Sequence, residues 1–286
     1  MRGELLSGDG AARALTDACE NVRSRLSYLC GEVGERAAYV APGPEPRDDE
    51  WIRCADLAAD PEGLAALVRA TGRSLGTEDP VVAASLFVQN YAYRVLTQAV
   101  ACATTSAVIP DSRASAMAFT VARGRPAKVA YAKPVALTVG EEFLGPSSGP
   151  ADEAARRAGV DFILRGAVEE HLRALIEATR QRVRVGERLL WGNVAASGAV
   201  AFRTMEGLSG PWVRSIAELF FQRAPTSLQG LGAFYSLEVR GRRGWFWERT
   251  NCCLHDHLPE AIRCGDCSLT PVDLRRAAYR DGLASS

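Results

Sequence analysis

Four cysteines near the end of the printed sequence constrain this chain more than any other feature. They are Cys252, Cys253, Cys264 and Cys267, in the pattern C-C-x10-C-x2-C. Half of the eight cysteines therefore fall within one short segment, which chance rarely produces. Thiolates bind soft and borderline metal ions, so a segment of this kind folds back until its sulfurs meet. The pattern predicts a metal centre.

The two halves of the pattern place different demands on the backbone. The C-x-x-C half is a common chelate, in which a tight turn aims Cys264 and Cys267 at one point, and we expect Gly265 to relieve strain in that turn. Adjacent side chains diverge in an extended strand, so Cys252 and Cys253 converge only at a turn. We therefore expect the adjacent pair to lie at a turn.

Spacing alone leaves three interpretations of this centre. Zinc sites usually draw both cysteine pairs from spaced knuckles, so an adjacent pair disfavours zinc slightly. A [2Fe–2S] centre needs two thiolates on each of two irons, and two pairs ten residues apart meet that need. Redox-active or incidental thiols are the third interpretation. His255 and His257 lie between the cysteine pairs, where the alternatives are a replacement ligand, a proton relay or a polar loop residue, and we interpret both as polar loop residues. We interpret His171 as a partly buried helix histidine that is not a ligand.

The cysteine pattern resembles that of the FhuF-like ferric siderophore reductases. Trp245-Phe-Trp-Glu-Arg-Thr-Asn251 and Leu190-Trp-Gly-Asn-Val-Ala-Ala-Ser197 resemble the same family, so the likeness covers about 190–270. Where the family often has a proline after the last cysteine, this chain has Ser268 and Leu269. The resemblance implies a [2Fe–2S] cluster on the four cysteines and one-electron transfer to a ferric siderophore.

The implied chemistry needs few other residues. Siderophores hold Fe³⁺ through hard oxygen donors, and they hold the softer Fe²⁺ weakly, so one electron releases the iron. No general base or nucleophile is required, and no G-x-G-x-x-G fingerprint follows a strand. We therefore expect an iron-uptake oxidoreductase whose electrons come from an external donor such as a ferredoxin or a flavoprotein. The alternatives are a zinc-stabilised binding or scaffold protein without redox activity, and an iron–sulfur electron carrier for another pathway.

Arginines crowd the segment before the cysteines and are weak candidates for substrate binding. The four are Arg240, Arg242, Arg243 and Arg249. One hypothesis makes them a landing surface for an anionic siderophore or an acidic ferredoxin. The other makes them the solvated turn of an amphipathic hairpin, on which Trp245 and Trp247 share one face and cover the cluster. Both hypotheses remain open at this point.

Charge and hydropathy restrict the location and the partners. The chain has 286 residues with 34 basic and 34 acidic side chains, so no net field favours nucleic acid or an anionic membrane. Its first residues contain no apolar region typical of a signal peptide. The longest weakly polar run, 99–110, is shorter than the roughly 20 residues of a membrane span. We expect no transmembrane segment and a cytoplasmic location, where cysteines remain thiols or metal ligands.

Periodicity predicts an α+β fold, mostly helical, with a small antiparallel sheet and a C-terminal hairpin that leads to the four-cysteine site. Helices are expected over 11–30, 61–73, 77–106, 151–183, 189–202 and 211–222. The start of the third is indicated by Thr77-Glu78-Asp79-Pro80, which supplies a capping side chain and a proline in the first turn. Strands are expected over 117–122, 128–132 and 135–139, and a hairpin over 233–250 with its turn at 241–244. The prolines of 41–50 predict a loop.

The glycine- and proline-rich stretch 145–150 is the best candidate for a linker. It separates an N-terminal α+β region, 1–145, from a helical region with the C-terminal iron–sulfur motif, 151–286. These regions are expected to form either two domains or one integrated domain.

Overall fold

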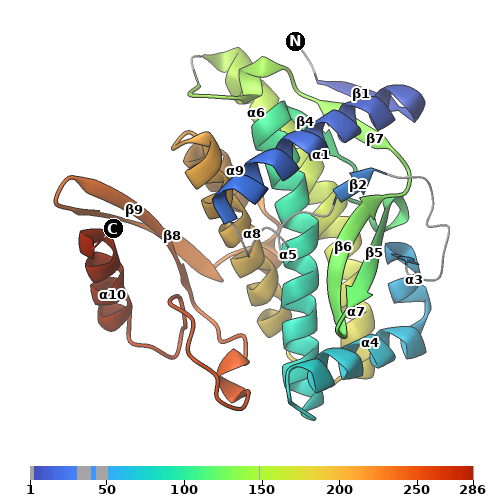
Figure 1. Ribbon diagram of the computed structural model, residues 1–286, viewed down its shortest axis with the longest axis vertical. Helices are drawn as coiled ribbons and strands as arrows, with labels where there is room; N and C mark the ends of the chain where they lie inside the picture. The colour runs from blue at the N-terminus through green and yellow to red at the C-terminus, as the bar shows by residue number, and fades with distance from the viewer. Residues whose placement is uncertain (1–2, 31–39, 43–50, 148, 286) are drawn as a thin grey trace.

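The computed structural model describes residues 3–30, 40–42, 51–147 and 149–285 (Figure 1). The α-helices are α1 (Gly8–Cys30), α3 (Cys54–Ala59), α4 (Pro61–Ser74), α5 (Pro80–Ser106), α6 (Pro150–Ile163), α7 (Arg173–Arg182), α8 (Glu187–Ser209), α9 (Val213–Arg223) and α10 (Val272–Ser285). A π-helix, η4 (Leu164–Leu172), joins α6 to α7. Short 3-10 helices are η2 (Ala114–Ala116), η3 (Glu141–Phe143), η5 (Thr226–Leu228) and η6 (His255–His257).

Two long helices, α5 and α8, pack against each other through the centre of the molecule (Figure 1). The start of α5 follows the expected signal: Asp79 caps it by accepting hydrogen bonds from the Val81 and Val82 amides, and Pro80 occupies the first turn. The helix ends at Ala107, whose φ of 51° is left-handed. On α8, small buried residues such as Ala195 and Ala199 let the two backbones approach closely.

In the described residues, short strands form three separate sheets. The first has the order β1 (Glu4–Ser7), β7 (Val135–Thr138), β4 (Val108–Pro110), and both of its pairings are antiparallel. The second has the order β2 (Val40–Pro42), β6 (Arg125–Tyr131), β5 (Met117–Ala122), β3 (Trp51–Arg53), and only its β2–β6 pairing is parallel. The third is the hairpin of β8 (Gly232–Val239) and β9 (Arg242–Arg249).

These elements confirm the predicted α+β class: the chain is mostly helical with small antiparallel sheets. Two details differ from the expectation. The strand predicted at 135–139 leaves the 117–132 hairpin and pairs with β1 and β4 instead. The C-terminal hairpin turns at Arg240 and Gly241, with φ of 51° and 77°, and not over 241–244. A two-residue turn in which both residues have positive φ matches the right-handed twist of the paired strands, which explains why the turn is shorter than expected.

One hydrophobic core runs from α1 to the C-terminal hairpin. It contains fully buried residues from both sides of the expected linker, including Phe87 on α5 and Phe202 on α8. Trp245 and Trp247 also belong to this core, where they stack on Phe234 and Phe221. Of the proline-rich loop expected at 41–50, residues 43–50 lie outside the described part of the chain.

The hairpin and α10 lie at one side of the molecule, at the left of Figure 1. Helix α10 packs on this hairpin: Arg276 pairs with Glu248 at 2.7 Å, and Tyr279 stacks on Phe246. The segment between β9 and α10 runs back towards the N-terminal end of α5 (Figure 1). That segment carries all four clustered cysteines, and we call it the cysteine segment, residues 250–271.

Candidate metal centre

The four clustered cysteines border one small cavity of about 10 Å³. Cys253 and Cys267 are buried, Cys252 is half-buried and Cys264 is exposed. The thiols of Cys253 and Cys264 lie within hydrogen-bonding distance of each other. Among the described residues, no three His, Cys, Asp or Glu side chains converge closely enough to hold a metal ion. The sulfurs therefore surround a common space without closing on a single point.

A turn at Leu254 brings the adjacent cysteines to this cavity. Leu254 has left-handed backbone angles, φ 65° and ψ 10°, and η6 begins directly after it. The Leu254 amide consequently donates a hydrogen bond to Cys252 Sγ at 3.2 Å. The His255 amide donates to the Cys253 thiol. The expected turn is present, and it points two backbone N–H groups at two sulfurs, as in sites that stabilise metal-bound thiolates.

The C-x-x-C half closes through a hydrogen bond from the Cys267 amide to the Cys264 carbonyl, at 3.0 Å. The expectation that Gly265 relieves strain here is wrong. Its φ lies outside the left-handed region, and a Cβ at this position meets no atom within 4 Å. A side chain is therefore compatible with this turn.

A buried arginine supplies positive charge beside the sulfurs. Arg249 is only 2% exposed and lines the cavity. The hydrogen bond donated by the Cys264 thiol lowers the pKa of Cys253, and the charge of Arg249 lowers it further. The same thiol–thiol bond raises the pKa of Cys264, while burial raises the pKa of Cys252. Of Cys252, Cys253 and Cys264, Cys253 is thus the one most readily deprotonated.

Polar side chains on α5 and α8 hold Arg249 and the cysteine segment in place. Arg249 donates from Nη2 to Asn193 Oδ1 at 2.9 Å. Asn193 in turn donates to the Ser85 carbonyl and hydroxyl, at 2.9 and 2.8 Å. The Ser85 hydroxyl then donates to the Cys253 carbonyl at 2.7 Å. One buried chain of hydrogen bonds therefore joins both central helices to a cysteine.

Close packing at Gly192 completes this support. A Cβ on Gly192 would lie 1.9 Å from Asn251 Nδ2, so only glycine leaves room for that side chain. Asn251 lies directly before the first cysteine and donates to the Leu189 carbonyl at 3.3 Å. Arg275 of α10 donates to the Arg249 and Asp266 carbonyls, at 3.3 and 3.4 Å.

Sequence reasoning missed Ser85, Asn193 and Arg275 as parts of this site. Asn193 lies inside the stretch 190–197 that suggested the family resemblance, which was the one available signal. Ser85 and Arg275 have no signal of their own, because a serine inside an apolar helix and an arginine in a polar one are ordinary residues. Only the fold brings them to the cysteines.

The four arginines proposed as a substrate surface do not form one group. Arg249 lies beside the cysteines, whereas Arg240, Arg242 and Arg243 are exposed at the other end of the hairpin. Arg242 and Arg249 are the two ends of β9 and lie seven positions apart, which is about 23 Å at the usual rise per residue. Arg243 also pairs with Glu238 at 2.8 Å.

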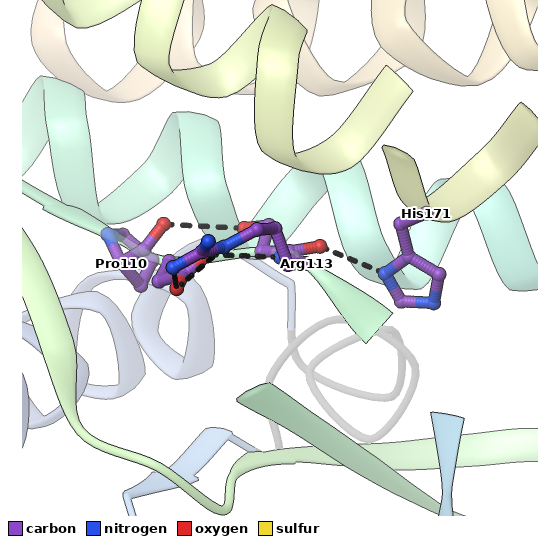
Figure 2. Close-up of polar contacts among 5 residues, drawn as sticks. Pro110, Arg113 and His171 are labelled. Atoms are coloured by element: carbon purple, nitrogen blue, oxygen red, sulfur yellow. Dashed lines mark hydrogen bonds and ion pairs between the residues drawn. The ribbon is translucent and has the colours of Figure 1, made fainter. Parts of the chain in front are cut away.

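His171 is a core residue, more deeply buried than expected, and both of its ring nitrogens are occupied. Nδ1 bonds the Ser112 carbonyl and Nε2 bonds the Tyr91 hydroxyl, each at 2.8 Å. Figure 2 shows the ring turned towards the segment of Pro110 and Arg113. Because a carbonyl only accepts, Nδ1 carries the proton and Nε2 accepts from Tyr91. Burial lowers the pKa of His171 to about 4.

The remaining cysteines with described side chains are core residues. Cys19, Cys54 and Cys102 are each at most 2% exposed, and none of them borders the cavity. Cysteines whose side chains are described are all free thiols. His255 lines the cavity, and His257 is an exposed residue of η6.

Comparison with known proteins identifies a family for the part of the chain that contains α8 and most of α5. The family described as "Ferric iron reductase FhuF-like transporter" matches residues 85–231, which is more than half of the chain. The matched region contains Ser85 and Asn193, and it ends before the cysteine segment. A search of curated proteins finds no match. In the described part of the chain, every helix is too short or too polar to cross a membrane.

Proposed function

Because the chain belongs to the FhuF-like ferric iron reductase family, we propose that it is a ferric siderophore reductase that uses a [2Fe–2S] cluster. The cluster ligands in this proposal are Cys252, Cys253, Cys264 and Cys267. The observation that carries the proposal is the gathering of these four thiols around one cavity beside a buried arginine. Membership of the family supports reduction of ferric iron, and the donor set supports an iron–sulfur centre.

The donor set and its surroundings fit such a cluster. Four thiolates, two ferric ions and two sulfides carry a net charge of about −2 by formal counting. Arg249 offsets part of that charge from a buried position, where its attraction is less screened than in water. The Leu254 and His255 amides point at two of the sulfurs, which stabilises electron-rich sulfur and tunes the potential.

Zinc is the alternative occupant of these four thiols. Structural zinc sites usually draw their cysteine pairs from spaced knuckles, so the adjacent pair Cys252 and Cys253 favours the cluster. Two cysteine pairs also match the need of a two-iron cluster for two thiolates on each iron.

The reaction is a one-electron transfer. When bound, the cluster would supply one electron at low potential, which converts Fe³⁺ in the chelate to Fe²⁺. An external one-electron donor, such as a ferredoxin or a flavoprotein, then returns the protein to its reduced state. Oxygen donors that hold Fe³⁺ firmly hold Fe²⁺ weakly, so reduction releases the iron. We place this release in the cytoplasm, where the free thiols remain reduced.

The experiment uses single-turnover reduction. Anaerobic protein reduced with dithionite is freed of excess reductant and mixed with a ferric siderophore, and Fe²⁺ is captured by a colorimetric chelator. We expect about one Fe²⁺ per cluster, no Fe²⁺ from Cys264→Ser, and unchanged release from the control His257→Ala. Full release from Cys264→Ser would refute the proposal.

A further inference from the structure

A second, larger cavity opens beside the cysteine site. Its volume is about 420 Å³, and it lies between α5, α8 and the cysteine segment. Leu86, Gln89 and Asn90 come from α5, and Val200 comes from α8. We call this space the α5–α8 cavity. It is far larger than the 10 Å³ cavity of the four cysteines.

The two cavities share a wall. Cys253, His255 and Cys264 border both of them, whereas Cys252 and Cys267 border only the small one. Cys264 is also the one exposed thiol of the four. The rate of electron transfer falls steeply with distance. A metal centre on these cysteines is separated from an acceptor in the α5–α8 cavity only by the shared wall, so the transfer distance is short. The arginines of the hairpin tip lie much farther away.

Unpartnered polar groups line this cavity. Gln89 Oε1 and Asn90 Oδ1 are buried and have no hydrogen-bond partner. A buried polar atom without a partner costs about 1–3 kcal/mol, so such atoms usually mark a place that a ligand or water fills. The Ser197 hydroxyl holds the backbone beside them by donating to the Gln89 carbonyl at 3.0 Å.

Arg125 adds a positive charge to the same wall. It follows the Arg123–Gly124 turn of the β5–β6 hairpin, which docks on α4 through a hydrogen bond from Thr71 to the Gly124 carbonyl at 2.8 Å. Its side chain is half-buried, and among the described residues it has no ion-pair partner. Of the described residues that line the cavity, Arg125 is the one Lys or Arg, and Asp266 is the one carboxylate.

We propose that the α5–α8 cavity binds the ferric chelate, with Arg125, Gln89 and Asn90 as the groups that hold it; this inference rests on the proposed function. Oxygens that coordinate Fe³⁺ accept hydrogen bonds from the Arg125 guanidinium, whereas Gln89 Oε1 and Asn90 Oδ1 are acceptors that pair with N–H or O–H donors on the organic skeleton of the chelate. Leu86 and Val200 offer apolar surface to the carbon skeleton of the chelate. Bound there, the iron lies on the Cys253–Cys264 side of the centre.

The test separates binding from reduction. Gallium(III) matches the charge of Fe³⁺ and resists reduction, so gallium complexes of a tris-hydroxamate and a tris-catecholate serve as binding probes in calorimetric titration. Two variants change the cavity. Arg125→Gln removes the positive charge of Arg125 from the wall, and Val200→Trp fills part of the cavity volume. Val200 is 38% exposed, so the larger side chain does not disturb the core. Arg242→Gln, at the hairpin tip, is the matched control.

We expect at least one probe to bind the unmodified protein. Arg125→Gln should weaken its binding about tenfold or more, as for loss of one charge-assisted hydrogen bond. Val200→Trp should abolish binding, and Arg242→Gln should leave it unchanged. Cluster absorption and the reduction of ferricyanide, a small oxidant that needs no pocket, should be normal in all three variants.

Two outcomes overturn the cavity assignment. Unchanged probe binding in both cavity variants refutes it, and so does weakened binding in Arg242→Gln alone; normal reduction of ferric chelates by the unmodified protein then leaves the proposed function intact. Conversely, probe binding that depends on Arg125 and Val200 in a protein that reduces no ferric chelate supports the cavity and refutes the reductase.

Discussion

The central helices and the cysteine segment are built by different physical means. Helices α5 and α8 contact each other through side chains that are almost wholly buried and mostly apolar, such as Val95 and Ala199. The cysteine segment has one 3-10 turn, η6. It packs through a small apolar cluster on Val82 and Leu86 of α5, and it receives polar contacts from Ser85, Arg249 and Arg275. Extensive apolar packing stabilises the central helices, whereas hydrogen bonds carry a larger share of the contacts that hold the segment.

The largest effect is expected from damage to the helical core. Phe87 on α5 is fully buried, so Phe87→Ala leaves a cavity and should lower the free energy of unfolding by about 3–5 kcal/mol. Urea denaturation measures this loss. The molecules that remain folded should hold the same amount of iron as the unmodified protein. A loss of iron per folded molecule would show that the two regions are not independent.

A pH effect of nearly that size should arise from His171. Its pKa is about 4 in the folded protein and about 6.5 when unfolded, so between these values only the unfolded chain binds the proton. The free energy of unfolding should therefore fall by about 3 kcal/mol as the pH drops from 6.5 to 4. His171→Gln keeps a donor and an acceptor and should flatten this part of the profile. An equally steep profile in that variant would assign the effect to other groups.

The sequence predicted the helical region better than the cysteine segment. The Asp79–Pro80 signal and the apolar period locate α5 because local capping and burial decide that helix. The short turn at Arg240 and Gly241 was missed, since tertiary twist selects it. The cysteine spacing identified the candidate ligands, but Ser85 and Asn193 reach them only through the contact of α5 with α8. Long-range hydrogen bonds of this kind leave no periodic trace in a sequence.

The third effect tests the link between the two regions. Asn193→Ala removes the bridge from Ser85 to Arg249 and leaves a buried guanidinium short of one acceptor. We expect a loss of about 1–3 kcal/mol in the free energy of unfolding, together with faster release of iron to a chelator. Gln229→Ala, which removes an exposed amide, is the control. If iron release is as slow in Asn193→Ala as in the control, the bridge does not hold the segment.

The smallest effects on stability come from a matched pair of glycines. Gly192→Ala gains about 1 kcal/mol of helix propensity but displaces Asn251, so its stability should change little while its hold on iron weakens. Gly265→Ala meets open space and should change neither quantity. Thermal unfolding and iron content of the two variants test this contrast. Equal iron retention in both variants would mean that the position of Asn251 does not affect how firmly iron is held.

The central claim is that the cysteine segment holds a two-iron cluster. The most direct measurement is the absorption spectrum of anaerobically purified protein, with iron and acid-labile sulfide assays, before and after dithionite. The account predicts red-brown protein with about two irons and two sulfides per chain, bleached on reduction. Colourless protein with one zinc ion per chain would contradict it and identify the segment as a structural zinc site.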